Sequence, residues 1–187
     1  FAFMIQAKNI IFDLGGVILD IDYNLTVSAF RDLGIARFEE HFTQAVQSSF
    51  FENFEKGLMT EEDFYAFIQA LSGKEWSREH IDAAWNKMLV AIPLRRLQIL
   101  QQLQLYHNTF LLSNTNTVHE KSFNKLLKEV CGYENLAVFF DKVYYSHRVG
   151  MRKPDKEIFQ LLIDECGLRP EDTLFIDDSI QHIRTAS

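Results

Sequence analysis

The residues best suited to chemistry lie where a short apolar run meets a carboxylate and two glycines. The run at 10–12 (Ile-Ile-Phe) precedes Asp13, and Gly15 and Gly16 follow almost at once. β-Branched and aromatic residues indicate a buried strand of a parallel sheet, and ligands bind just beyond the carboxyl ends of such strands. Asp13 is therefore placed where chemistry happens, and the glycines let the backbone approach a small anion. A final Asp that only caps a turn explains this motif equally well.

A second apolar run ends in polar residues that precede a predicted helix. Ser113, Asn114 and Thr115 follow the run at 110–112. A hydroxyl and backbone amides at a strand end, next to a helix N-terminus, can cradle a phosphate. The same three residues could simply cap the helix, and this simpler interpretation is favoured if the motif is taken alone.

Charged residues complete the set in the last part of the chain. Lys153 directly precedes Pro154, which suits the first turn of a helix, so its ammonium can point at a neighbouring anion; an exposed loop lysine is the alternative. Asp177 and Asp178 end another apolar run. Adjacent carboxylates repel unless a cation or donor compensates, and Mg²⁺ prefers carboxylate and water oxygens.

The elements that must position these residues follow from the hydrophobic pattern. Apolar runs predict buried strands at 9–12, 109–112, 143–145 and 173–176. Helical patterns separate the last three strands, which is typical of a parallel sheet. From Asp22 to about Val90 we find no strand-like run, only amphipathic helical patterns, with helix starts at Thr60 and Ser77.

A helical insertion of this length is too long for an ordinary crossover. We therefore predict an α/β fold, a Rossmann-like parallel sheet with an inserted all-helical cap domain. The sheet domain is expected at 1–20 and 91–187, and the cap at 21–90. The helical pattern of the cap includes Phe38, Phe42 and Val46.

Composition bounds the class of protein. The chain has 187 residues, 47% of them hydrophobic, and a formal net charge of -7, which argues against nucleic-acid binding. Neither a membrane span nor a signal peptide is evident, and Cys131 and Cys166 are too few for a disulfide framework, so we expect a cytoplasmic protein. Residues 1–3 are interpreted as a tag or vector remnant ahead of Met4.

Taken together, the four motifs resemble those of the haloacid dehalogenase superfamily of hydrolases. The phrases Phe-Asp-Leu-Gly-Gly-Val-Ile-Leu-Asp-Ile-Asp, Leu-Ser-Asn-Thr-Asn, Gly-Met-Arg-Lys-Pro and Phe-Ile-Asp-Asp look like the bacterial α-D-glucose-1-phosphate phosphatase branch. The resemblance covers essentially the whole chain, and the helical segment lies where the family places its cap. It implies an Mg²⁺-dependent phosphatase that acts on a small phosphorylated metabolite such as glucose 1-phosphate.

The resemblance assigns a role to each motif. Asp13 would be the nucleophile that forms an aspartyl-phosphate, and Ser113 and Lys153 would act with it in catalysis. The phosphoryl group would be bound by Ser113, the amide of Asn114, Lys153 and Gly16. The resemblance implies these magnesium ligands: Asp13, the Gly15 carbonyl, Asp178, and Asp177 as a ligand or in support.

The sequence departs from the family pattern at several positions. Phosphatases of this family usually carry a second Asp two residues after the nucleophile, and Gly15 stands there instead. Because that Asp is the general acid, we expect a preference for acidic leaving oxygens such as anomeric ones, with Asp20 or Asp22 as candidate substitutes. His182 stands where many relatives have Asn or Asp. The family normally continues beyond the fourth motif, so we expect residues after Ser187.

Two other functions remain open from the sequence. A 2-haloacid dehalogenase uses the same nucleophile without a metal, but its fourth motif replaces the paired acids found at Asp177 and Asp178. A catalytically poor relative that binds a phosphorylated ligand is favoured only by Gly15. Retention of Asp13, Lys153 and Asp178 argues against it.

Overall fold

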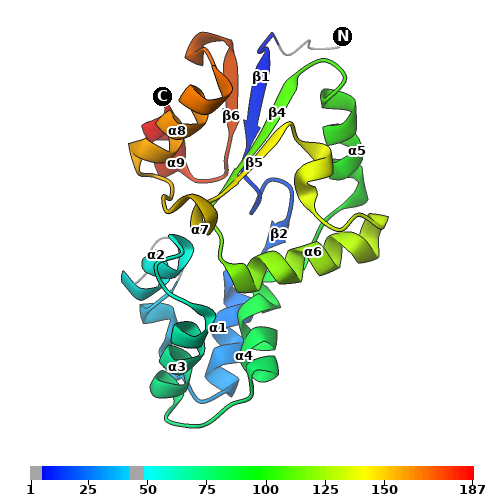
Figure 1. The fold of residues 1–187 in the computed structure, drawn as a ribbon. Helices are drawn as coiled ribbons and strands as arrows, with labels where there is room; N and C mark the ends of the chain where they lie inside the picture. The colour runs from blue at the N-terminus through cyan, green and yellow to red at the C-terminus, as the bar shows by residue number, and fades with distance from the viewer. Residues whose placement is uncertain (1–5, 43–48) are drawn as a thin grey trace.

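A four-stranded parallel sheet forms the centre of the protein. The computed structural model describes residues 6–42 and 49–187, so predictions for Phe1–Phe3, Met4 and Val46 lie outside the described residues. The strand order is β5-β4-β1-β6 (Figure 1). The strands are β1 Asn9–Phe12, β4 Asn108–Ser113, β5 Lys142–Tyr145 and β6 Thr173–Ile176. All four predicted strands are present, and β1 and β6 have the predicted bounds.

Helices cover both faces of this sheet. On one face, α5 (Leu94–Leu103) and α6 (Thr117–Cys131) pack against β1 and β4 in one apolar cluster. On the other face, α8 (Lys156–Cys166) packs in a second cluster, with α9 (Ile180–Ala186) beside it (Figure 1). The connecting elements are η3 Leu136–Phe139, α7 Ser146–Val149 and η4 Pro170–Asp172. The fold is thus α/β and Rossmann-like.

A helical segment is inserted between β1 and β4. Its elements are α1 Tyr23–Asp32, η1 Phe38–Glu40, α2 Ser49–Glu55, α3 Glu61–Ser72, α4 Arg78–Trp85 and η2 Asn86–Met88. Thr60 and Asp63 form a reciprocal capping box at α3, and Ser77 caps α4. Aromatic side chains packed around the buried Trp85 give this segment its own core. The predicted helical starts and inserted helical segment are confirmed.

A short antiparallel ribbon joins the helical segment to the sheet. β2 (Asp20–Ile21) pairs with β3 (Leu89–Ala91). The prediction that no strand lies between Asp22 and Val90 is therefore wrong at its end. β2 leads the chain from the sheet domain into the helical segment, and β3 leads it back. Because the two strands pair with each other, their backbone N–H and C=O groups are satisfied where the chain passes between the two parts. This ribbon straddles both predicted domain limits, and the division into 1–20, 21–90 and 91–187 stays a prediction.

A second contact between the helical segment and the sheet domain lies at the end of α2. Glu55 pairs with Arg152 at 3.0 Å, and Lys56 pairs with Asp155 at 2.8 Å. Gly57 has φ +67, and a Cβ there would lie 2.2 Å from a backbone carbonyl of α7. Only glycine allows this close approach. Among the described residues, no helix combines the length and apolar character needed to cross a bilayer.

Candidate active site

Two carboxylates meet at the carboxyl edge of the sheet because their strands are neighbours in register. Phe12 of β1 pairs with Ile176 of β6, so Asp13 and Asp177 are lateral neighbours just beyond the paired residues. The Asp13 N–H continues the ladder by donating to the Ile176 carbonyl at 2.8 Å. Strands in a sheet are about 4.8 Å apart. The backbone therefore brings two negative charges together, and a positive charge must compensate them.

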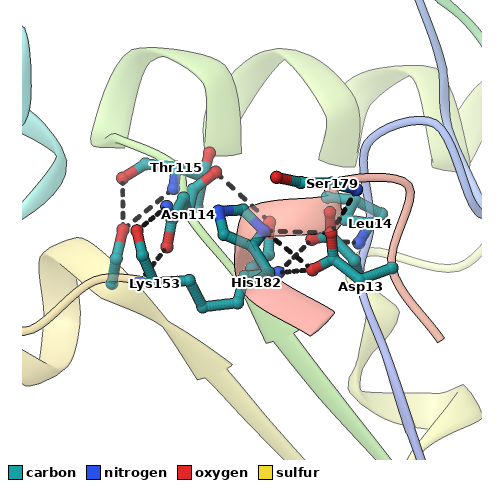
Figure 2. A network of polar contacts seen from close by, with 10 residues as sticks. Asp13, Leu14, Asn114, Thr115, Lys153, Ser179 and His182 are labelled. Atoms are coloured by element: carbon teal, nitrogen blue, oxygen red, sulfur yellow. Dashed lines mark hydrogen bonds and ion pairs between the residues drawn. The ribbon is translucent and has the colours of Figure 1, made fainter. Parts of the chain in front are cut away.

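Lys153 supplies that charge (Figure 2). Its Nζ lies 2.9 Å from Asp13 Oδ1 and 2.5 Å from Asp177 Oδ2, and the lysine is fully buried. Burial raises the pKa of Asp13 above its ordinary value, while the Lys153 ammonium opposes this rise. Burial would also raise the pKa of Asp177, but hydrogen bonding to His182 and the Lys153 charge outweigh it and lower that pKa. The alternative of an exposed loop lysine is excluded.

The backbone of Lys153 is held by a single side chain. Asn114 accepts from the Lys153 N–H through Oδ1 and donates to the Lys153 carbonyl through Nδ2, both at 2.8 Å. The Lys153–Pro154 peptide bond is cis. The fully buried Ser146 hydroxyl similarly bridges the N–H and carbonyl of Thr115 at 2.9 and 3.0 Å. The Asn114 side chain thus positions the ammonium, a role that we did not predict; phosphate binding by its backbone amide stays a prediction.

His182 holds Asp177 from the first turns of α9. Its Nδ1 lies 2.9 and 3.0 Å from the two carboxylate oxygens, and the Ser179 N–H donates to Oδ1 at 2.8 Å. Both oxygens of Asp177 are therefore engaged by protein groups, including Lys153. The imidazole thus braces Asp177 at the position where the family resemblance led us to expect Asn or Asp.

The turn after β1 brings Asp178 against the backbone of Gly16. Gly16 has φ +71, and a Cβ there would lie 2.3 Å from Asp178 Oδ2. Among the described residues, the turn's backbone hydrogen bonds use the carbonyls of Leu14 and Leu19 but not that of Gly15. Partial desolvation and the neighbouring Asp177 charge raise the pKa of Asp178. Gly15 itself has an ordinary φ, and an added Cβ would lie 3.3 Å from the side chain of Ile21.

The oxygen donors near Asp13 suit a hard divalent cation. Asp13 and Asp178 are carboxylates with raised pKa values, which a bound cation would relieve, and the Gly15 carbonyl adds a neutral oxygen. Ligand atoms of Asp13, Asp177 and His182 also lie within 4.8 Å of one another. Because Asp177 is held by Lys153 and His182, it is better suited to support the site than to bind the ion directly. These donors fit Mg²⁺.

A cavity of about 380 Å³ opens over these residues, between the sheet edge and the helical segment. The sheet side is lined by Asp13, Ser113, Asn114, Thr115 and Asp178, and the helical segment contributes Tyr23, Phe42, Glu55 and Met88. Ser113 is buried at the end of β4. The structure thus brings together Asp13, Ser113, Lys153, Asp177 and Asp178, as the motifs predicted.

Neither candidate for a substitute acid lies in this cavity. Asp20 pairs with Arg96 at 2.7 Å, and Asp22 caps α1 by accepting from the Asn24 N–H at 2.9 Å. Neither lines the described cavity. Both carboxylates thus fix local structure in this conformation, and a role of Asp20 or Asp22 as the substitute acid stays a prediction.

The fold and the carboxylate–lysine site are those of a hydrolase with a Rossmann-like parallel sheet and an inserted helical segment. Over residues 7–187 the chain matches the haloacid dehalogenase-like (HAD) hydrolases, and it belongs to that family. It is similar to D-ribitol-5-phosphate phosphatase of Bacteroides thetaiotaomicron, at 33% identity over 184 residues, 94% of this chain and 85% of that protein. The resemblance inferred from the four motifs is confirmed at the level of the superfamily.

Two solved structures of HAD family members are also similar to this chain over most of its length. An aspartate-to-alanine variant of a HAD family enzyme from Bacteroides thetaiotaomicron, in complex with magnesium and inorganic phosphate, has a TM-score of 0.91 and 36% identity, covering 96% of this chain and 89% of that chain. A HAD-like family hydrolase from Porphyromonas gingivalis has a TM-score of 0.88 and 32% identity, covering 97% and 87%.

Proposed function

We propose that this protein is an Mg²⁺-dependent phosphatase that acts on a small phosphorylated metabolite through an aspartyl-phosphate on Asp13. The observation that carries the proposal is the fully buried Lys153 ammonium, which contacts both Asp177 and the carboxylate of Asp13, a residue that lines the cavity. A buried positive charge beside a nucleophilic carboxylate suits a substrate whose reacting group is anionic. The cavity volume of about 380 Å³ suits a small molecule.

In this reaction Asp13 is the nucleophile, and Lys153 and Ser113 stabilise the phosphoryl group. A carboxylate oxygen of Asp13 forms a bond to phosphorus, and the bond from phosphorus to the leaving oxygen breaks. Asp13 Oδ1 accepts a hydrogen bond from the Leu14 N–H and pairs with the Lys153 ammonium. Lys153 and Ser113 stabilise the charge on the phosphoryl oxygens. Water then hydrolyses the acyl phosphate, which regenerates Asp13 and releases phosphate.

Asp13, the Gly15 carbonyl and Asp178 would hold Mg²⁺, with Asp177 supporting them. The ion supplies charge neutralisation, so that an anionic substrate can approach a carboxylate. Magnesium is bound in the related HAD enzyme structure from Bacteroides thetaiotaomicron. The donor set of this chain fits the same ion.

The substrate class proposed is a phosphorylated polyol or sugar. A relative at 33% identity is named for its action on D-ribitol 5-phosphate. Glucose 1-phosphate is the second candidate, because Gly15 leaves no acid for the leaving oxygen and an anomeric oxygen needs less help. A cytoplasmic location stays a prediction from the sequence.

Phosphate release tests the proposal directly. The metal-free protein is assayed with p-nitrophenyl phosphate, D-ribitol 5-phosphate, glucose 1-phosphate and glucose 6-phosphate, with Mg²⁺ and with Mg²⁺ plus excess chelator. We expect release only with free Mg²⁺, and none from Asp13→Asn, which should still fold because Lys153 keeps its contact with Asp177. Chelator-insensitive halide release from 2-haloacids, without phosphate release, would instead indicate the dehalogenase.

A further inference from the structure

Tyr23 is the first residue of α1, just after the ribbon that leads into the helical segment. The preceding residue fixes this point of the chain, because the Asp22 N–H donates to the Met88 carbonyl at 3.0 Å and its carboxylate caps α1. Two residues before Tyr23, Ile21 lies against the turn after β1, since a Cβ added at Gly15 would lie 3.3 Å from its side chain. Both Ile21 and Tyr23 line the cavity. The backbone thus brings Tyr23 into the cavity wall close to the turn that carries Gly15.

The aromatic ring of Tyr23 is held by the helical segment. It packs on Phe42 with centroids 5.7 Å apart, and Phe42 packs in turn on the buried Trp85 at 4.7 Å. These contacts use the ring and not the hydroxyl. The core of the helical segment therefore positions Tyr23 without engaging its polar atom.

The Tyr23 hydroxyl is accessible and has no partner in the protein. It forms no hydrogen bond with any described residue. Within the described part of the chain, the buried side-chain atoms that lack a partner belong to Asn116, Thr117, His119, Asn124 and His147. The Tyr23 oxygen is not one of these buried atoms, so a ligand can reach it.

The charged groups around this hydroxyl show that it faces the cavity. The charges that act on it are those of Glu55, Asp13, Asp178 and Arg152, and all four residues line the cavity. Burial of the phenol and the three carboxylates raise the pKa of Tyr23, and the Arg152 charge opposes this rise. The hydroxyl therefore lies between the carboxylates of the sheet edge and the Glu55–Arg152 pair, and it keeps its proton over the physiological range.

We propose that Tyr23 is a specificity-determining residue whose hydroxyl forms a hydrogen bond with a hydroxyl group of the substrate's leaving group. Because an Asp13 oxygen attacks phosphorus in line with the leaving oxygen, the leaving group points away from the sheet edge and toward the helical segment. A phenol hydroxyl both donates and accepts, which matches the hydroxyls of a polyol or a sugar. This inference rests on the proposed phosphatase function and adds a residue that recognises the leaving group.

The test compares two tyrosines of the helical segment. Tyr23→Phe removes one oxygen and keeps the ring contact with Phe42, and it should fold as the parent does because that oxygen has no protein partner. Tyr65→Phe is the control, since the Tyr65 hydroxyl donates to Asp82 at 2.9 Å and Tyr65 does not line the described cavity. The readout is the ratio of kcat/KM for the best of D-ribitol 5-phosphate, glucose 1-phosphate and glucose 6-phosphate to that for p-nitrophenyl phosphate, which has no hydroxyl.

We expect Tyr23→Phe to lower this ratio about tenfold, which corresponds to the loss of one ordinary hydrogen bond, mainly through KM of the hydroxylated substrate. The control should keep the ratio of the parent. An unchanged ratio in Tyr23→Phe, or equal losses on the hydroxylated substrate and on p-nitrophenyl phosphate, overturns the inference.

A second measurement does not depend on turnover. Calorimetry with Mg²⁺ and the unreactive Asp13→Asn variant gives Kd for inorganic phosphate and for the best hydroxylated substrate, with and without Tyr23→Phe. We expect Tyr23→Phe to raise Kd of the hydroxylated substrate about tenfold and to leave Kd of inorganic phosphate unchanged. Equal weakening of both ligands overturns the inference, because Tyr23 would then act on the phosphoryl site.

The parent protein separates the two proposals. If it hydrolyses p-nitrophenyl phosphate with Mg²⁺ but prefers no hydroxylated substrate, the inference fails and the phosphatase stands. If it hydrolyses none of the four, the proposed function itself fails.

Discussion

Replacing Lys153 with Met should destabilise the protein strongly, because one buried ammonium serves two carboxylates. At an effective dielectric constant of about 20, a pair of unit charges at the 2.9 Å separation from Asp13 is worth about 6 kcal/mol before desolvation is counted. Removing one partner of a buried pair typically costs about 3–5 kcal/mol. Asp177 loses the same partner, so we expect the unfolding free energy to fall by about 4 kcal/mol at pH 7.

Urea denaturation in the presence of chelator measures this loss. The control is Lys56→Met, since the Lys56–Asp155 pair is 2.8 Å long but its side chains are 29% and 44% exposed. A solvent-exposed ion pair of this kind contributes about 0–1 kcal/mol to the free energy of unfolding. A Lys153→Met loss within the range of the control would refute the reasoning.

The pH dependence of the same experiment has a defined sign. Without Lys153, the pKa values of Asp13 and Asp177 rise in the folded state, so the folded variant binds protons that the unfolded chain does not. Its stability therefore falls as pH rises, and the difference from the parent should shrink on going from pH 7 to about pH 5. Added Mg²⁺ should stabilise the variant more than the parent, because the ion replaces a missing positive charge. A pH-independent difference would show that lost packing, not charge, causes the effect.

Three further predictions concern the turn after β1 and the contact at α2. Gly15→Asp should raise kcat/KM for glucose 6-phosphate by about 10²-fold, the lower end of a general acid's contribution, and for glucose 1-phosphate by less; equal gains would contradict this. Gly16→Ala should raise the Mg²⁺ concentration needed for half-maximal activity by about 10-fold or more, because its Cβ would lie 2.3 Å from Asp178 Oδ2. Glu55→Ala should lower the unfolding free energy by about 2 kcal/mol in urea, because it leaves the largely buried Arg152 without this carboxylate.

The sequence alone determined the features that depend on short stretches of chain. The strand at Asn9–Phe12 and the placement of Asp13 follow from one apolar run and the residue types around it. The capping box of Thr60 and Asp63 is decided within four residues, and it forms as the pattern predicts. The βαβ pattern fixed a parallel sheet, and a parallel sheet gathers its strand ends at one edge.

Only the tertiary structure decided which side chains pair within that edge. Lys153 was compatible with an exposed loop, and burial between Asp13 and Asp177 depends on segments far apart in the chain. The contact of His119 with Asn86, at 2.9 Å, likewise joins α6 to the inserted helical segment. Local propensity carries no information on such pairs, because their energy comes from burial and from partners that the fold brings together.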